Sequence, residues 1–166
     1  MKLVLSLLLF AFSGGTAYAQ TPHVDRIDVP EYGIYTANMD SKVPAPGTAT
    51  GTRNVVGNVQ HEATTRTVPA QLGVHFGFRY SVVGAPDGAA VLLNRVTIFP
   101  PPGLRNPANP QPKTRSELDL ARRIGEQYYA DYSFDNDWEI VPGIWTFQLW
   151  YEGRMLAEQT FTVVRQ

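Results

Sequence analysis

The sequence predicts an all-β fold, an immunoglobulin-like antiparallel sandwich with at most one short helix. Three observations support this prediction. Short apolar stretches alternate with turn-forming residues along most of the chain, which holds 14 glycines and 13 prolines in 166 residues. Several of these stretches alternate strictly between apolar and polar side chains, as strands with one buried face do. Only one segment shows a helical period, so the pattern indicates a sandwich or barrel of short strands.

The beginning of the chain has the three parts of a secretory signal peptide. A short positive start precedes an apolar core over residues 3–12, and the small-residue site Ala17-Tyr18-Ala19 follows. The core is too short for a spanning helix, which needs about 20 residues. The alternatives are an uncleaved anchor and a buried helix. We expect residues 1–19 to be a cleaved signal peptide and residues 20–166 to form one immunoglobulin-like domain, periplasmic or secreted.

Composition argues against several classes of protein. The chain has no cysteine, which excludes a lipid-modified cysteine after the signal, thiol chemistry and stabilisation by disulfides. The formal net charge of −1 gives no basic face for nucleic acid. No polybasic stretch is present to bind anionic lipid. No second apolar run approaches spanning length, so we expect no stable membrane insertion once the signal is removed.

The first half of the mature chain predicts several short strands. Residues 24–29 and 31–37 are the first two, separated by a proline. Residues 38–52 are polar and rich in proline and glycine, without an apolar period, and we expect a loop there. Residues 54–60 and 63–68 are predicted to be short strands.

The clearest strand covers residues 74–83. Its apolar side chains fall on one face and its polar or small side chains on the other, so one face should be buried and the other wet. Residues 84–88 form a turn by composition. Residues 89–99 are then predicted to return as the hairpin partner. The buried face of the first strand is predicted to consist of Phe76, Phe78, Tyr80 and Val82.

A long connection and the one predicted helix follow. Residues 100–112 contain many prolines, which lack the backbone donor that a strand needs, so we expect an irregular connection. Residues 114–127 predict a short helix, because Leu118, Ala121 and Ile124 recur at three-residue spacing. The pair Arg122-Arg123 would then lie on a solvated helix face.

The last third predicts further strands. Residues 128–134 and 138–141 are separated by an acidic turn, and Pro142-Gly143 forms the next turn. The final hairpin is the most strongly predicted element. Its strands cover residues 144–151 and 154–164, because Trp145, Phe147, Leu149 and Tyr151 alternate with Thr146, Gln148 and Trp150.

Three stretches carry a family resemblance: VPAQLGVHFGFRY (residues 68–80), FPPPGLRNP (residues 99–107) and DWEIVPGIWTFQLWYEGRMLAEQTFTV (residues 137–163). In this order they resemble an uncharacterised family of exported bacterial proteins, a domain of unknown function with an immunoglobulin-like fold. The resemblance implies a sandwich fold and an exported location. It implies no activity and no site residue.

No metal site is predicted. The three histidines, His23, His61 and His75, have no partner histidine or cysteine at the spacing of zinc sites. Four acidic residues crowd one strand-turn-strand region but lack the pattern of a calcium loop, so a polar turn is favoured. These four residues are Asp131, Asp135, Asp137 and Glu139.

No catalytic or cofactor motif is present either. The chain lacks a nucleophile elbow, a phosphate-binding loop and a dinucleotide-binding fingerprint. Acidic pairs such as Glu139 and Glu152 occur by chance in any chain with 15 acidic residues. We therefore expect a protein that is not an enzyme and has no cofactor.

Aromatic side chains gather in the final third, where alternation must turn some of them away from the core. Exposed rings with polar neighbours can stack on sugars or anchor a protein partner. The alternative is that both faces of these strands are buried. The candidate ligand-binding residues are Tyr128, Tyr129, Trp138 and Trp150.

Together these observations predict an exported, non-catalytic binding or protein-interaction domain of the bacterial cell envelope. The expected partner is another envelope protein or a glycan. A carbohydrate-binding module that uses exposed aromatic rings is the first alternative, and an envelope hydrolase is the second.

Overall fold

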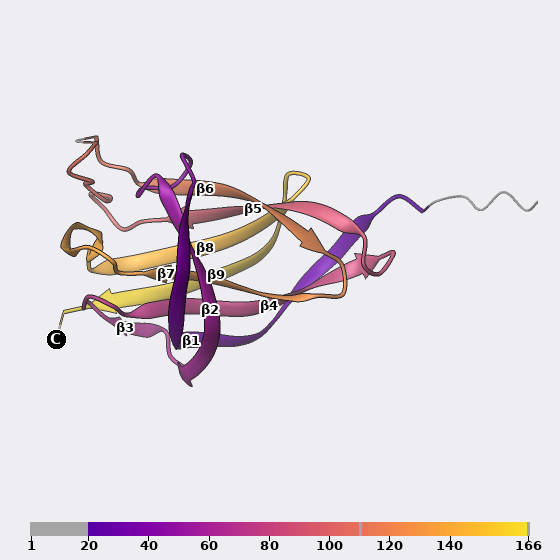
Figure 1. The fold of residues 1–166 in the computed structure, drawn as a ribbon, viewed down its shortest axis with the longest axis horizontal. Helices are drawn as coiled ribbons and strands as arrows, with labels where there is room; N and C mark the ends of the chain where they lie inside the picture. Colours follow the sequence, from indigo (N-terminus) through magenta and orange to yellow (C-terminus); the bar gives the residue numbers. More distant parts are fainter. Residues whose placement is uncertain (1–19, 110, 166) are drawn as a thin grey trace, which may run out of the picture.

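The fold consists of two β-sheets that pack face to face (Figure 1). A computed structural model describes residues 20–109 and 111–165, so the predicted signal peptide, residues 1–19, lies outside the described residues. The elements are β1 (His23–Pro44), β2 (Thr52–Ala63), β3 (Thr67–Pro69), β4 (His75–Ala85), β5 (Ala90–Ile98), β6 (Arg115–Arg123), β7 (Gln127–Ser133), the 3-10 helix η1 (Asp137–Glu139), β8 (Gly143–Tyr151) and β9 (Arg154–Val164).

The strands divide between a four-stranded sheet, β2-β1-β4-β7, and a five-stranded sheet, β3-β9-β8-β5-β6. Only β3 and β9 pair in parallel; the other neighbouring strands are antiparallel. In the part of the chain that the structure describes, no helix is long and apolar enough to cross a membrane. The predicted all-β sandwich is confirmed.

The core lies between the sheets and is rich in aromatic rings. Phe76 is at its centre, with its ring centroid 5.3 Å from that of Phe134 and 5.6 Å from that of Trp145. Such pairs add about 0.5–1.5 kcal/mol each to the free energy gained by burial. The alternation that the sequence shows in β4 and β8 is confirmed: their buried inward residues are Phe76, Phe78, Tyr80, Val82, Trp145, Phe147, Leu149 and Tyr151.

The predicted helix over residues 114–127 is wrong, because most of this segment is strand β6. The three-residue spacing of apolar residues was coincidental. A period of two also runs through the segment: Ser116, Leu118, Leu120 and Arg122 are buried or half-buried, and the residues that alternate with them are exposed. Since β6 pairs with β5 along its whole length, that period decides its structure.

The predicted hairpin of residues 74–83 with residues 89–99 is also wrong. β4 pairs with β1 and β7, whereas β5 pairs with β6 and β8 in the other sheet. Both strands carry apolar side chains that face the same core, and a short turn joins strands of opposite sheets as readily as strands of one sheet. The turn composition alone could not distinguish the two arrangements.

The predicted loop over residues 38–52 is wrong in its first half, because β1 continues to Pro44; residues 45–51 form a turn, and β2 begins at Thr52. This part of the chain shows no apolar period because it lies outside the sandwich and is held by backbone hydrogen bonds. Two smaller differences concern residues 63–68, where the strand β3 covers only Thr67–Pro69, and residues 138–141, which overlap η1 rather than a strand.

The long strand β1 changes partner at its middle. Residues 23–35 pair with β4, whereas residues 34–44 pair with β2. Beyond the change, β1 and β2 form a two-stranded segment that runs across the other strands toward β6 (Figure 1). We call this segment, residues 36–60 with its turn at residues 45–51, the ribbon.

Gly33 lies at the point where the partner changes, and its backbone approaches the end of β2 closely. It has φ +140°, and a Cβ atom there would overlap the carbonyl oxygen of Ala63. Only glycine fits both conditions without a shift of the backbone. The position of the ribbon therefore depends on this residue.

We expect Gly33→Ala to lower the free energy of unfolding by at least about 3 kcal/mol, because it adds a backbone clash to an unfavourable φ. Gly73→Ala is the matched control: Gly73 has φ +79°, but a Cβ atom added there would have no neighbouring atom within 4 Å. Its cost should be about 1 kcal/mol. Urea unfolding of both variants measures the difference, and equal costs would show that close approach at Gly33 does not matter.

Candidate functional site

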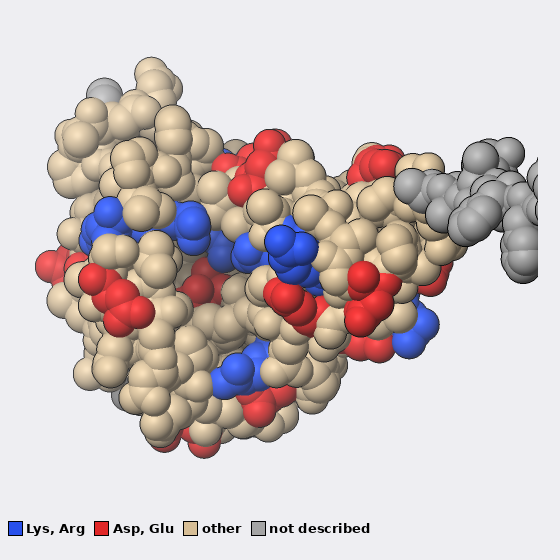
Figure 2. Space-filling view, turned by 45° about the vertical axis from the view of Figure 1, so that its right-hand side comes forward, with Lys and Arg blue, Asp and Glu red and all other residues tan. Residues whose placement is uncertain are grey.

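A cleft of ≈ 480 Å³ lies beside the edge strands β7 and β6 and beneath the ribbon. Residues of β5, β6 and β7 form its walls, and residues of β2 cover it. Its volume falls in the range of small-molecule sites, about 300–1,000 Å³. Figure 2 shows a hollow on this face of the molecule, with Lys and Arg side chains on either side of it.

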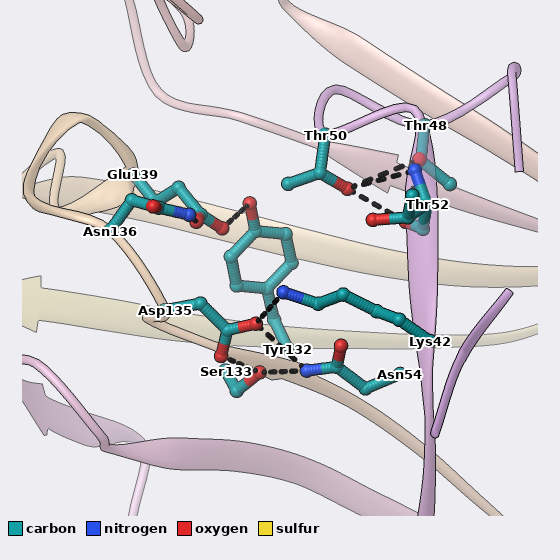
Figure 3. Close-up of polar contacts among 10 residues, drawn as sticks. All are labelled: Lys42, Thr48, Thr50, Thr52, Asn54, Tyr132, Ser133, Asp135, Asn136 and Glu139. Atoms are coloured by element: carbon teal, nitrogen blue, oxygen red, sulfur yellow. Dashed lines mark hydrogen bonds and ion pairs between the residues drawn. The ribbon is translucent and has the colours of Figure 1, made fainter. Parts of the chain in front are cut away.

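The turn of the ribbon is attached to β6 and to the residues before it. The amide of Ala49 donates to the hydroxyl of buried Ser116 at 2.8 Å, and Lys113 donates to the carbonyl of Thr48 at 3.0 Å. Within the turn, the hydroxyls of Thr48 and Thr50 both donate to the carbonyl of Thr52, as Figure 3 shows. These bonds hold the ribbon across the space between the two sheets.

A second attachment joins the ribbon to the end of β7 through Asp135 (Figure 3). Its carboxylate accepts from Asn54 at 2.9 Å and from Ser133 at 2.8 Å, and lies 3.1 Å from the ammonium of Lys42. Burial acts to raise the pKa of Asp135, but the hydrogen bonds from Asn54, Ser133 and Lys42 outweigh it, so the pKa is lowered from 3.8. In its ionised form Asp135 therefore stabilises the attachment of the ribbon to the end of β7.

Glu139 is the most deeply buried carboxyl group of the cleft, with 1% of its surface exposed. The hydroxyl of Tyr132 donates to its Oε2 at 2.6 Å and the amide of Asn136 donates to its Oε1 at 2.5 Å (Figure 3). Burial raises the pKa of Glu139, and these two hydrogen bonds oppose the rise. Both carboxyl oxygens are occupied by the protein itself.

Three arginine side chains from three strands line the cleft: Arg53 on β2, Arg95 on β5 and Arg122 on β6. Arg95 donates to the carbonyl of Asp131 on the edge of β7 at 3.4 Å. Burial lowers the pKa of Arg95; the charge of Asp131 opposes this, and Arg122 and Arg53 lower it further. The Nε of Arg122 donates to the hydroxyl of Tyr80 at 2.7 Å. Positive charge is therefore concentrated here.

Tyr129 brings an unsatisfied polar atom to the cleft. Its ring packs on that of Tyr35, with 4.7 Å between centroids, and its hydroxyl is buried without a hydrogen-bond partner among the described residues. Burial raises the pKa of Tyr129, so the hydroxyl is a neutral donor. An unpaired buried hydroxyl costs about 1–3 kcal/mol, which water or a ligand can offset.

The structure brings two of the four predicted binding residues together. Tyr129 and Trp138 both line the cleft. Tyr128 lies outside it, with its hydroxyl donating to Glu126 at 2.6 Å and its ring beneath the guanidinium of Arg122 at 4.5 Å. Trp150 lies on the outward face of β8, and its indole donates to Gln148 at 3.0 Å.

The histidines and acidic residues do not form a cluster. No group of three or more His, Cys, Asp or Glu side chains in residues 20–109 and 111–165 is placed to hold a metal ion. His61 lies 3.6 Å from Glu31, which also pairs with Arg79 at 2.9 Å, and His75 lies 3.5 Å from Asp131. Glu139 and Glu152 lie beyond opposite ends of β8.

Sequence reasoning missed the arginines. Arg122, expected on a solvated helix face, instead points toward the cleft because its segment is β6. One signal for Arg95 was present, since it shares the alternation of buried Leu93 and Phe99 and so had to point inward. Nothing in the sequence pattern marks Arg53, whose place in the cleft depends on the path of the ribbon.

We expect Asp135→Asn to lower the free energy of unfolding by about 1 kcal/mol at neutral pH, since the pair with Lys42 is partly exposed. The pKa of Asp135 is lower in the folded protein than in the unfolded chain, where it is near 3.8. The stabilisation is therefore complete at pH values above 3.8 and is lost as the pH falls through the pKa of the folded protein. Urea unfolding at several pH values should therefore show the difference from wild type shrinking in acid.

Asp137→Asn is the control for that series, because Asp137 is an exposed neighbour in η1. Its effect should stay within about 0.5 kcal/mol, as for a surface substitution that removes no contact. A loss for Asp135→Asn that is the same in acid and at neutral pH would show that the carboxylate charge does not hold the ribbon.

Comparison with known proteins places this architecture in a family. An immunoglobulin-like protein from Pseudomonas aeruginosa is similar in structure, with a TM-score of 0.59 and 24% identity over 87% of this chain and 98% of that one. This likeness confirms the immunoglobulin-like fold.

The DNA-bound alkylpurine DNA glycosylase AlkC of Pseudomonas fluorescens matches at a TM-score of 0.35 and 12% identity over 60% of this chain and 28% of that one, which is too remote to support an argument. No curated protein matches the sequence. The family model named Domain of unknown function (DUF3859) matches residues 23–163, and the chain belongs to that family.

Proposed function

We propose that this protein is an exported, non-catalytic binding module of the cell envelope and that the cleft beneath the ribbon is its ligand site. The observation that carries the proposal is the unpaired, buried hydroxyl of Tyr129 in a cleft of ≈ 480 Å³. Well-packed sandwiches bury few polar atoms without partners. A cleft whose lining contains such a buried, unpaired hydroxyl is suited to a molecule that supplies the missing partner. The signal-like residues 1–19 support export.

The carboxyl groups of the cleft support binding over hydrolysis. The pKa of Asp135 is lowered and that of Glu139 is raised, as in acid–base pairs of hydrolases. Each group is already used, however: Asp135 holds Lys42 and Asn54 of the ribbon, and Glu139 accepts from two neighbours. A general acid or base must reach the substrate instead. These contacts therefore favour a structural role, and the hydrolase remains the weaker alternative.

The aromatic side chains favour a cleft over a flat platform for sugars. In the part of the chain that the structure describes, every tyrosine and tryptophan is buried or only partly exposed. Trp150 is partly covered, and its indole N–H is already used. Tyr129 and Trp138 instead offer their rings inside the cleft. We infer that a glycan or a segment of an envelope protein enters the cleft.

The three tryptophans provide a direct test, because each reports on a different place. Trp138 lines the cleft, Trp145 is fully buried in the core and Trp150 lies on the outward face of β8. Isotope-labelled protein is titrated with soluble glycan and peptide fragments of bacterial envelopes, and the indole N–H signals are followed by NMR. A ligand of the cleft should shift the Trp138 signal and leave that of Trp150 in place.

A pair of leucine variants makes this test specific. Leu118→Phe adds volume to the cleft, whereas Leu92→Phe makes the same change on the exposed face of the neighbouring strand β5. We expect Leu118→Phe to weaken binding at least about tenfold, because overpacking in a filled site costs about 1–3 kcal/mol, and Leu92→Phe to leave it unchanged. Binding that shifts only Trp150, or that both variants retain, would contradict the proposal.

A further inference from the structure

We propose that the ligand of the cleft is anionic, carrying a carboxylate or phosphate group, and that Arg53, Arg95 and Arg122 recognise this group. The inference rests on the proposed function, because it names the chemical class of ligand for the same cleft. It is drawn from the placement of the arginines, the hydrogen bonds that they leave unmade and the local balance of charge.

The three guanidinium groups come from separate strands, and Arg53 joins the lining only because the ribbon crosses the sheet edges. Arg95 and Arg122 lie on the inward faces of the neighbouring strands β5 and β6, and Arg53 reaches the cleft from β2. Arg95 and Arg122 are partly buried and Arg53 is exposed, and the charges of Arg122 and Arg53 both act to lower the pKa of Arg95. Such repulsion between like charges is strongest where water is partly excluded. The fold holds them there nonetheless, which indicates a group of opposite charge.

Much of their hydrogen-bonding capacity remains free. A guanidinium has five N–H donors in a planar fork that matches a carboxylate or phosphate. Arg95 donates once, to a backbone carbonyl at 3.4 Å, and Arg122 donates to Tyr80 and to the carbonyl of Ala121. Arg53 makes no hydrogen bond or ion pair with the residues that the structure describes. None of the three is paired with a carboxylate through its side-chain donors.

The carboxylates of the cleft do not neutralise these arginines. Asp135 is held by Lys42 at 3.1 Å, and Glu139 accepts from Tyr132 and Asn136. Asp131 is the remaining carboxylate of the lining, and it also lies 3.5 Å from His75. Three guanidinium groups thus face one shared carboxylate, although the whole chain has a net charge of −1. The positive surplus is local to the cleft.

Tyr129 supplies a neutral donor to the same ligand. Its buried hydroxyl lacks an acceptor, and an anionic oxygen is the acceptor that such a group prefers. Trp138 adds an indole ring to the lining. The combination of arginine forks, one tyrosine hydroxyl and an aromatic wall suits a small acidic group on a sugar or at the end of a peptide, and equally a phosphate ester.

The probes for the test are galacturonate, galactose and inorganic phosphate. Galacturonate and galactose differ in one carboxylate, so their comparison isolates the charge, and phosphate tests the second source of the same chemistry. The indole signal of Trp138 is followed by NMR in labelled protein at low and high salt. We expect galacturonate, phosphate or both to shift Trp138, with weaker binding at high salt, and galactose to leave it in place.

Arginine variants assign the charge to the cleft. Arg53→Gln should weaken anion binding about tenfold, because it removes charge-assisted hydrogen bonds without disturbing a contact of the fold. Arg115→Gln on β6 is the control, since Arg115 is exposed, pairs with Glu117 and does not line the cleft. Arg122→Lys keeps the positive charge but loses the planar set of guanidinium donors. It should therefore weaken binding less than an uncharged side chain at position 122 would.

The outcomes separate this inference from the proposed function. A shift of Trp138 by an anion, weakened in Arg53→Gln but not in Arg115→Gln, supports it; a response to galacturonate alone or to phosphate alone identifies the source. Anion binding that Arg53→Gln and Arg122→Lys leave unchanged overturns it. If Trp138 responds to neutral envelope fragments but to no anion, the inference fails and the proposed function stands. If Trp138 responds to none of these molecules, both fail.

Discussion

The close approach of two backbones at Gly33 determines how the rest of the structure is arranged. There β1 leaves its pairing with β4 and continues with β2 alone, which is possible because Gly33 has no side chain to meet Ala63. The continuing strands cannot join the sandwich, so they cross it as the ribbon. The cleft, its cover and the meeting of Arg53 with Arg95 all follow from this one change of partner.

Two different kinds of interaction stabilise the sandwich and the ribbon. Aromatic rings around Phe76 hold the two sheets together in a dry core. Polar contacts attach the ribbon: a buried one to Ser116 and exposed ones to Asp135. Since each such contact contributes about 0.5–1.5 kcal/mol, the ribbon is attached to the sandwich less strongly than the two sheets are to each other.

The sequence predicted correctly those strands that have one buried face and one face exposed to solvent. Residues 74–83 and 144–151 show that alternation, and both are strands. In β6 a chance three-residue spacing of Leu118, Ala121 and Ile124 hid the same period. The ribbon escaped prediction because its backbone pairing and its contacts through Lys42 and Asp135 join residues far apart in sequence, which leaves no local pattern. Aromatic content identified Tyr129 and Trp138 but could not separate them from Tyr128 and Trp150, because alternation gives the face of a strand and not what covers it.

The ribbon has a second conceivable role, which is to protect the free edges of β6 and β7 from pairing with other chains. Protection alone would be served best by direct packing on those edges. The ribbon instead contacts them at its turn and through Asp135, and leaves ≈ 480 Å³ between these attachments. Its lining includes Tyr129, whose buried hydroxyl is unpaired, and three arginines, two of which act to lower the pKa of the third. A cover that served only as protection has no need of such unfavourable groups, whereas a binding site gains from every one of them when its ligand arrives.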